Sequence, residues 1–152
     1  MNAVGALILV VAVLGATVFA LWRRHRDGRL RAISTAAGDR SATQEAAAAF
    51  PVAELGIELG RRATLVQFST AFCQPCRATR STLLQVAEMV DGVVSVEVDA
   101  ESHLDQVRAL NILRTPTVFV LDAGGTVRQR AVGAPRKADV IAAVGALDGA
   151  GH

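Results

Sequence analysis

The sequence predicts an α/β fold: a mixed sheet of four to five strands with helices on both faces, preceded by one N-terminal transmembrane helix. Three observations predict this class. An uncharged apolar stretch of 20 residues lies near the start of the chain, at residues 3–22. From residue 50 onward, short runs rich in strand-forming residues alternate with stretches of helical spacing. The first two short runs are separated by a helix, whereas the last two are separated only by a glycine turn.

The first predicted element is a transmembrane anchor at residues 1–22. At about 1.5 Å per residue, the uncharged stretch would form a helix about 30 Å long, which matches the hydrocarbon thickness of a bilayer. Trp22 ends the stretch, where an aromatic ring suits the headgroup region. A cleaved signal peptide is the competing interpretation. It is disfavoured because no basic residue precedes the stretch and no A-x-A-like site closes it.

A basic, Ala-rich juxtamembrane linker is predicted at residues 23–49. Residues 1–42 carry six arginines against two aspartates, a net charge of +4, whereas residues 43–152 carry −2. Positive charge beside a span tends to stay in the cytoplasm, so we expect a cytoplasmic domain, with an extracytoplasmic one as the alternative. The Arg cluster at 23–31 is also expected to contact anionic lipid. The domain itself has no basic stripe with interleaved aromatics, which argues against a nucleic-acid partner.

The remaining elements form one domain, predicted at residues 50–152. Pro51 suits the first position of a helix that Gly60 would end. Arg128 and Arg130 predict that one side of the last strand faces solvent. The predicted strands are 64–69, 93–98, 117–121 and 126–132. The residues expected at helical spacing are Val52, Leu55, Gly56, Leu59, Leu83, Val86, Ala87, Val90, Leu104, Val107, Leu110, Val140, Ile141, Val144 and Leu147.

The connections predict how these strands pair. The strands at 64–69 and 93–98 are joined through a helix, so we expect them to be parallel. The strands at 117–121 and 126–132 are joined by Ala123-Gly124-Gly125, so we expect an antiparallel hairpin. The predicted sheet is therefore mixed.

The segment Cys73-Gln74-Pro75-Cys76 is the candidate redox site, because it follows a strand and opens a helix. The first turn of a helix presents unpaired N–H groups and the positive end of its dipole, and both stabilise a thiolate. Such sites lower the pKa of a cysteine from about 8.5 to about 3.5–7.5. The first cysteine of the motif is exposed and the second lies one turn in. We therefore predict that Cys73 attacks a disulfide and Cys76 resolves the mixed disulfide.

Other interpretations of the cysteine pair fit the sequence less well. A zinc site takes four ligands, but the chain has no third cysteine, and His25, His103 and His152 lie apart. Arg77 stands where c-type haem attachment requires a histidine. An inert structural disulfide would be unusual in a cytoplasmic domain. We therefore predict no metal and no cofactor, and a non-catalytic thiol- or copper-binding module remains an alternative.

Five segments of the domain carry a resemblance to a known family. They are residues 65–68 (LVQF), 72–77 (FCQPCR), 96–99 (VEVD), 111–117 (NILRTPT) and 132–134 (VGA). In this order they resemble the thioredoxin family over about residues 50–148, which implies a thioredoxin-like fold. The chain also resembles the Ala- and Arg-rich, single-span thioredoxin-like proteins of actinobacteria.

The resemblance implies roles for individual residues. Pro116 falls on the family's cis-proline, so the Thr115–Pro116 bond is expected to be cis. Thr115 would then face Cys73, ready to pair with an extended substrate as an added strand. Asn111 replaces a glycine, and asparagine tolerates positive φ. The implied substrate groove consists of Phe72, Gln74, Pro75, Thr115, Pro116 and Gly133.

The chain departs from the family pattern where the family moves a proton. Gln67 replaces the buried aspartate that is thought to take the proton of the second cysteine. Ser95 stands where the family has the lysine that faces that aspartate, so a neutral pair is expected. Glutamine cannot take up a proton at accessible pH. We therefore expect Cys76 to lose its proton to water or to the departing thiolate, so resolution should be slow near pH 7.

The expected function is a membrane-tethered thiol–disulfide oxidoreductase that mainly reduces protein disulfides. The expected partners are disulfide-containing proteins and an electron donor such as a thioredoxin reductase or a low-molecular-weight thiol. The membrane would be contacted through residues 3–22 and 23–31, and we expect a monomer. The alternative enzyme acts outside the cytoplasm, as a disulfide oxidant or as a reductase in cytochrome assembly.

Overall fold

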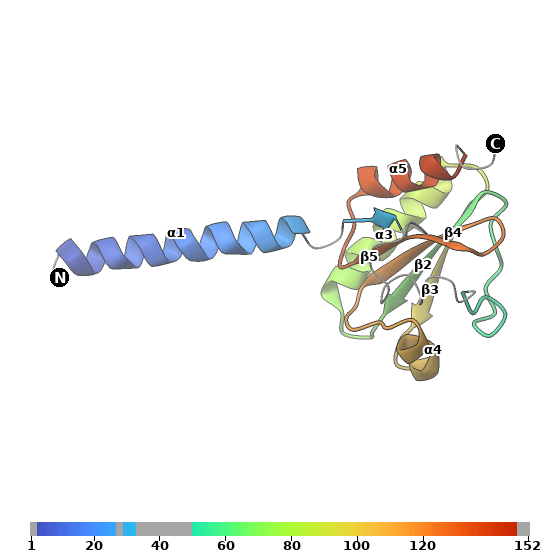
Figure 1. The fold of residues 1–152 in the computed structure, drawn as a ribbon, viewed down its shortest axis with the longest axis horizontal. Coiled ribbons are helices and arrows are strands. Elements are labelled where there is room, and N and C mark those ends of the chain that lie inside the picture. Colours follow the sequence, from blue (N-terminus) through green and yellow to red (C-terminus); the bar gives the residue numbers. More distant parts are fainter. Residues whose placement is uncertain (1–2, 27–28, 33–49, 149–152) are drawn as a thin grey trace, which may run out of the picture.

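The computed structural model describes residues 3–26, 29–32 and 50–148, with side chains described at 7–22, 29–30 and 50–147 (Figure 1). Most of the predicted linker, at 33–49, and the last residues of the predicted domain, at 149–152, lie outside the described residues. The elements in chain order are α1 (Ala3–Arg26), β1 (Arg31–Ala32), β2 (Ala63–Ser69), α3 (Gln74–Met89), β3 (Val93–Asp99), α4 (Leu104–Ala109), β4 (Thr117–Asp122), β5 (Val127–Val132) and α5 (Lys137–Asp148).

The strands form one mixed sheet in the order β1-β5-β4-β2-β3. Strands β2 and β3 are parallel, and β4 is antiparallel to both β2 and β5. The predicted parallel pair and the predicted hairpin are therefore confirmed. Strand β2 is buried along its whole length, because it has a neighbouring strand on each edge and a packed layer on each face.

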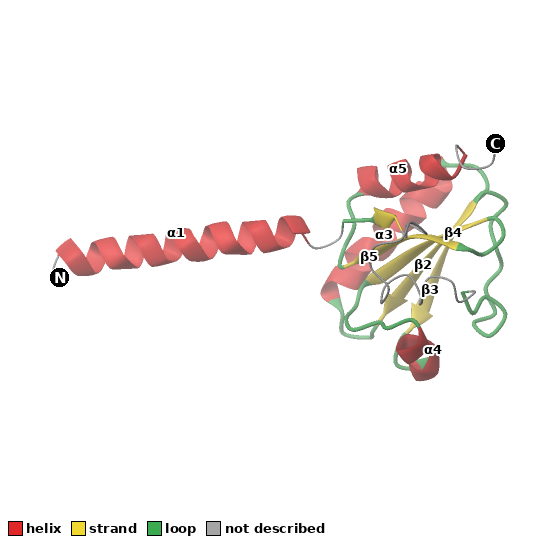
Figure 2. Ribbon diagram, in the orientation of Figure 1, coloured by secondary structure: helices red, strands yellow, loops and turns green. Residues whose placement is uncertain are grey.

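The two faces of the sheet carry separate hydrophobic cores. Helices α3 and α5 lie side by side on one face, where Leu65 and Leu83 are buried (Figure 2). On the other face, the rings of Phe50, Phe68 and Phe119 contact one another with centroids 5.3–6.5 Å apart. The half-buried side chains of Val107 in α4 and of Leu110 just after it pack against this second core. Helices on both faces are thus confirmed.

The predicted helix at residues 51–59 is wrong. Residues 52–56 form turns instead, closed by hydrogen bonds from the Ile57 amide to the Val52 carbonyl and from the Leu55 amide to the Pro51 carbonyl. Gly56 has a φ of +61°, which ends a helical turn in the left-handed region. Gly56 therefore ends the helical conformation after one turn, although apolar residues at helical spacing continue to Leu59.

Two side chains expected on particular faces lie elsewhere. Ile141 is exposed, whereas Val140 and Val144 are buried against the sheet. Arg130 is half-buried and lies over the ring of Phe119, with its guanidinium carbon 5.1 Å from the ring centroid. The expected solvent-facing side of β5 therefore holds for Arg128 but not for Arg130, whose guanidinium lies over an aromatic ring.

The N-terminal part contains a helix and a short strand. Helix α1 contains residues 3–22 of the predicted anchor, and its side chains from Leu7 to Trp22 are exposed. Among the described residues, however, no helix is both long and apolar enough to cross a membrane. The helix itself is confirmed, and the membrane span is not shown. Within the predicted linker, Arg31 and Ala32 form β1 and pair with β5 at the edge of the sheet.

Candidate active site

The two cysteines are joined in a disulfide at the N-terminus of α3, with their Cα atoms 5.2 Å apart. Cys73 is the N-cap residue of the helix, and its sulfur accepts a hydrogen bond from the Cys76 amide at 3.2 Å. Pro75 lies in the first turn, where no amide hydrogen is needed for the helix. Cys73 is half-buried, whereas Cys76 is only 2% exposed. A nucleophile that solvent can reach and a second sulfur beneath it are suited to disulfide exchange.

A second loop meets the turn that carries Cys73. The Thr115–Pro116 peptide bond is cis, as expected from the resemblance. The hydroxyl oxygens of Thr70 and Thr115 are 3.3 Å apart, so this loop contacts the end of β2. The Gly133 amide donates to the Pro116 carbonyl at 2.7 Å, with Gly133 at a φ of +96°. Thr115, Pro116 and Gly133 therefore lie at one end of the sheet next to the turn that carries Cys73, whereas the side chain of Phe72 in that turn is almost fully exposed.

Asn111 supports this arrangement from the start of the same loop. Its φ is +48°, which confirms that asparagine takes the left-handed conformation here. Its carbonyl accepts a hydrogen bond from Arg130 at 2.8 Å. The loop that ends in the cis-proline thus begins at Asn111, where a hydrogen bond from Arg130 connects it to β5.

Gln67 is buried beside the dithiol, with 1% of its surface exposed. Its side-chain amide donates to the Cys76 carbonyl at 3.0 Å, so the residue connects β2 to the first turn of α3. Its side-chain oxygen has no hydrogen-bond partner among the described residues. The side-chain nitrogen of Gln67 therefore helps to position the first turn of α3. Its side-chain oxygen receives no hydrogen bond from the described residues.

The register of β2 and β3 corrects the expected neighbour of Gln67. Ser95 pairs with Leu65, and the residue in register with Gln67 is Glu97. The expected neutral pair of Gln67 and Ser95 is therefore replaced by an amide beside a carboxylate. Sequence reasoning missed Glu97, because the register of a parallel pair depends on packing across a helical connection. Arg80 was the signal in the sequence that could have indicated Glu97. It lies one helical turn beyond Cys76, where its guanidinium can pair with a carboxylate on β3.

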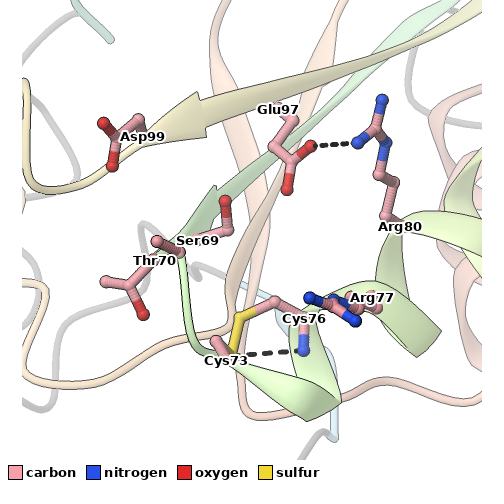
Figure 3. A pocket seen from close by; sticks show the side chains of 9 residues that line it. Ser69, Thr70, Cys73, Cys76, Arg77, Arg80, Glu97 and Asp99 are labelled. Carbon is pink, nitrogen blue, oxygen red and sulfur yellow. Dashed lines mark hydrogen bonds and ion pairs between the residues drawn. A yellow bond between two sulfur atoms is a disulfide. The ribbon is translucent and has the colours of Figure 1, made fainter.

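A cavity of about 270 Å³ lies between the dithiol and the ends of β2 and β3 (Figure 3). An Arg80 nitrogen and a Glu97 oxygen form an ion pair at 3.0 Å along its wall. The residues with charge or sulfur that line it are Cys73, Cys76, Arg77, Arg80, Glu97 and Asp99. Since liquid water occupies about 30 Å³ per molecule, the cavity has room for several water molecules next to the cysteines.

The other carboxylate in this cavity already has its own donors. Asp99 accepts hydrogen bonds from the Ser102 hydroxyl and the Glu101 amide. These bonds, with Ser102 contributing most, lower the pKa of Asp99 below its usual value. Asp99 is therefore ionised near neutral pH. Its two hydrogen bonds stabilise the turn that follows β3.

Comparison with known proteins supports the same assignment. A sequence profile of the family described as Thioredoxin matches residues 53–146. A curated thioredoxin from Mycoplasma genitalium is 30% identical over 81 residues, which cover 53% of this chain and 78% of that protein.

Solved structures resemble the domain in its fold. A crystal structure of chloroplastic thioredoxin z has a TM-score of 0.54 and 27% identity, covering 59% of this chain and 80% of its own. Spinach chloroplast thioredoxin f has a TM-score of 0.51 and 22% identity, covering 59% and 79%. At that lower identity the likeness concerns the fold alone.

Proposed function

This chain belongs to the thioredoxin family, and from that premise we propose that it reduces protein disulfides through Cys73 and Cys76 on a membrane-tethered domain. The family and the redox pair support thiol–disulfide oxidoreductase activity. The observation that carries the proposed roles is the position of Cys73 at the start of α3. There the sulfur accepts a backbone N–H and meets the positive end of the helix dipole, so its thiolate is stabilised.

The proposed reaction has two exchange steps. The Cys73 thiolate attacks one sulfur of a substrate disulfide, and the other substrate sulfur leaves as a thiolate. The Cys76 thiolate then attacks the Cys73 sulfur, releases the first substrate sulfur and forms the Cys73–Cys76 disulfide. The substrate gains two electrons and the enzyme loses two. A thioredoxin reductase or a low-molecular-weight thiol would return them.

Substrate binding is proposed at the loops around the disulfide. Phe72 is 99% exposed and offers an apolar contact beside Cys73. The cis bond before Pro116 leaves the Thr115 backbone next to the turn that carries Cys73, where an extended peptide could add as a strand. Gly133, which also borders this groove, has no side chain to obstruct it. Gln74 and Pro75, both exposed, would complete the contact.

The proposed tether rests on the sequence of α1. This helix has 24 residues, about 36 Å at 1.5 Å per residue, and a bilayer core is about 30 Å thick. Residues 3–22 contain no charge, and the described side chains from Leu7 to Trp22 face solvent. The arginines at 23–31 favour a cytoplasmic domain and contact with anionic lipid.

Trapping of mixed disulfides tests the roles and the tether together. In the full chain, Cys76→Ser should accumulate mixed disulfides through Cys73, whereas Cys73→Ser should accumulate none and lose disulfide reduction. The two variants are matched, because each removes one sulfur and the same internal disulfide. With Cys76→Ser, the trapped complexes should sediment with membranes, and removal of residues 1–28 should release them.

Three results would contradict parts of this proposal. Trapping by Cys73→Ser instead of Cys76→Ser would reverse the assigned roles. Complexes that remain soluble with the full chain would exclude the tether. Labelling of Cys73 in intact cells by a membrane-impermeant maleimide would place the domain outside the cytoplasm and favour the alternative enzyme.

A further inference from the structure

We propose that Glu97 receives the proton of Cys76 through water in the cavity, and that Arg80 is the positioning residue that holds Glu97 there. This inference rests on the proposed role of Cys76 as the resolving cysteine. It assigns to β3 the proton transfer that the buried aspartate on β2 is thought to perform elsewhere in the family. Position 67 cannot perform it here, because a glutamine side chain has no group that takes up a proton near neutral pH.

The alternation of the strands places Glu97 on the face that carries α3. Leu65 and Val93 belong to the core under α3, whereas Phe68 and Val98 belong to the opposite core. Side chains two residues apart share a face, so Glu97 lies on the same face as Val93. The register then puts Glu97 beside Gln67, whose amide contacts the backbone of Cys76.

The ion pair with Arg80 keeps the Glu97 carboxylate toward the cavity. Arg80 follows Cys76 by four residues, so the two side chains lie on one side of α3, one turn apart. The side chain of Glu97 is 32% exposed and that of Arg80 is 62% exposed, so water reaches the pair. In Figure 3 the Glu97 carboxylate lies on the wall above Cys76, with Arg80 beside it.

The other groups around the cavity are less suited to take the proton. Asp99 accepts a hydrogen bond on each of its two oxygens, from the Glu101 amide and the Ser102 hydroxyl, whereas the ion pair with Arg80 uses one oxygen of Glu97. Arg77 and Arg80 on α3 are cations. On the facing part of β2 the side chains are neutral. Glu97 is therefore the carboxylate of this cavity that pairs with a cation, whereas Asp99 accepts from a backbone amide and a hydroxyl.

Protons and electrons balance in the proposed step. The Cys76 thiol gives its proton to a cavity water, which passes a proton to the Glu97 carboxylate. The Cys76 electron pair forms the bond to the Cys73 sulfur, and the bond from that sulfur to the substrate breaks. The substrate sulfur leaves as a thiolate with the bonding pair and is reduced, while Cys76 is oxidised. Once Glu97 is neutral, the charge of Arg80 is no longer compensated and favours the developing negative charge nearby.

The proposal changes the pH dependence expected from Gln67 alone. Without a proton acceptor, resolution would rise about tenfold per pH unit with the fraction of ionised Cys76. With an ionised Glu97 as acceptor, part of the rate no longer depends on pH. If Glu97 acted only through its charge, Glu97→Gln would speed up resolution, because removing a nearby negative charge would favour the Cys76 thiolate.

The test uses the mixed disulfide of Cys73 with thionitrobenzoate, formed when the reduced full chain in detergent micelles reacts with Ellman's reagent. Attack of Cys73 on the reagent releases a first coloured thiolate and attack by Cys76 releases a second, and stopped-flow absorbance follows this second, first-order phase from pH 6 to 9. We expect Glu97→Gln to resolve at least about tenfold more slowly at pH 6.5, with the rates converging at alkaline pH. The resolution rate of Arg80→Met at pH 6.5 should lie between those of Glu97→Gln and the unsubstituted chain. Asp91→Asn, which breaks the remote pair with Arg61, should match the unsubstituted chain.

Several outcomes would overturn the assignment. Equal pH profiles for Glu97→Gln and the unsubstituted chain would show that Glu97 takes no proton. The same slowing at every pH would indicate a structural effect, and faster resolution would indicate a charge effect only. Slowing by Asp99→Asn in place of Glu97→Gln would transfer the role to Asp99. Since Ellman's reagent needs no biological substrate, these results are separate from a failure of the proposed function, which would appear as absent trapping by Cys76→Ser.

Discussion

Gln67 is the residue at which this domain differs most from the pattern it otherwise follows. Its amide supports the carbonyl of Cys76, and its own oxygen has no protein donor among the described residues. A neutral side chain avoids the desolvation of a buried charge. The proton transfer is then left to Glu97, which is partly solvated and has a cationic partner.

Replacing Gln67 by aspartate should make stability fall as pH rises. Burial raises the pKa of a carboxyl group above its unfolded value of about 3.9, because desolvation disfavours the charged form. Between the two pKa values the folded state binds more protons than the unfolded state. The free energy of unfolding then decreases by up to about 1.4 kcal/mol per pH unit.

The isosteric control for this prediction is Gln67→Asn, which cannot titrate. Urea unfolding of the Gln67→Asp and Gln67→Asn variants in detergent micelles at pH 4 and pH 8 would measure the difference. A stability gap between these two variants that is the same at both pH values would contradict burial of the introduced carboxyl.

At the scale of elements, glycines decide where regular structure stops. The spacing of apolar residues predicts that Gly60 ends a helix. Instead, Gly60 lies three residues before β2, and its Cα packs closely against neighbouring backbone atoms. A Cβ there would be 2.3 Å from the Ala63 carbonyl oxygen and 2.7 Å from that of Gly92. In α5, by contrast, a Cβ on Gly145 would meet nothing within 4 Å.

Alanine at these two positions should therefore have opposite effects. Gly60→Ala should lower the free energy of unfolding by more than about 1 kcal/mol, because backbone must move to avoid the overlap. Gly145→Ala should raise it by about 0.5–1 kcal/mol, because glycine inside a helix costs that much relative to alanine. Chemical unfolding of both variants would check this. Stabilisation by Gly60→Ala would show that the close approach is not maintained.

At the scale of the whole molecule, the domain begins earlier than its apolar pattern suggests. Strand β1 pairs with β5, so Arg31 lies opposite Arg130 and Ala32 opposite Gln129. Leu30 packs against the core under α3 and α5. The residues that connect α1 to the sheet therefore number only four, from 27 to 30. If α1 is a membrane anchor, a connection of that length keeps the dithiol domain close to the bilayer surface.

Removing β1 should destabilise the domain. A chain that begins at Arg29 should unfold at higher urea than one that begins at Thr43, because it retains Leu30 and the pairing to β5. Partial burial of one leucine contributes about 1 kcal/mol or more. Urea unfolding of the two truncated chains would measure the difference. Identical midpoints would show that β1 adds nothing to the stability of the sheet.

The sequence by itself determined the four strands β2 to β5, the helix after the cysteines and the dithiol, and through its family resemblance the cis-proline, but it did not indicate β1. These features depend on local signals: β-branched runs, helical spacing, a Cys-x-x-C at a strand–helix junction, and motifs in a fixed order. Local patterns also predicted a helix at 51–59 and two solvent-facing arginines on β5. The helix does not form because Gly56 takes the left-handed conformation, and Arg130 is half-buried because it lies over the ring of Phe119, whereas Arg128 is exposed as expected.

Only the tertiary structure decided which side chain lies beside Gln67. The register between two parallel strands depends on how α3 packs across the sheet, and no local pattern around Ser95 or Glu97 encodes it. A shift of two residues keeps every side chain on its face, so both registers satisfy the same alternation of buried and exposed positions. Packing selects the register that brings Glu97 and Arg80 together next to the dithiol, and with it the carboxylate that we assign to proton transfer.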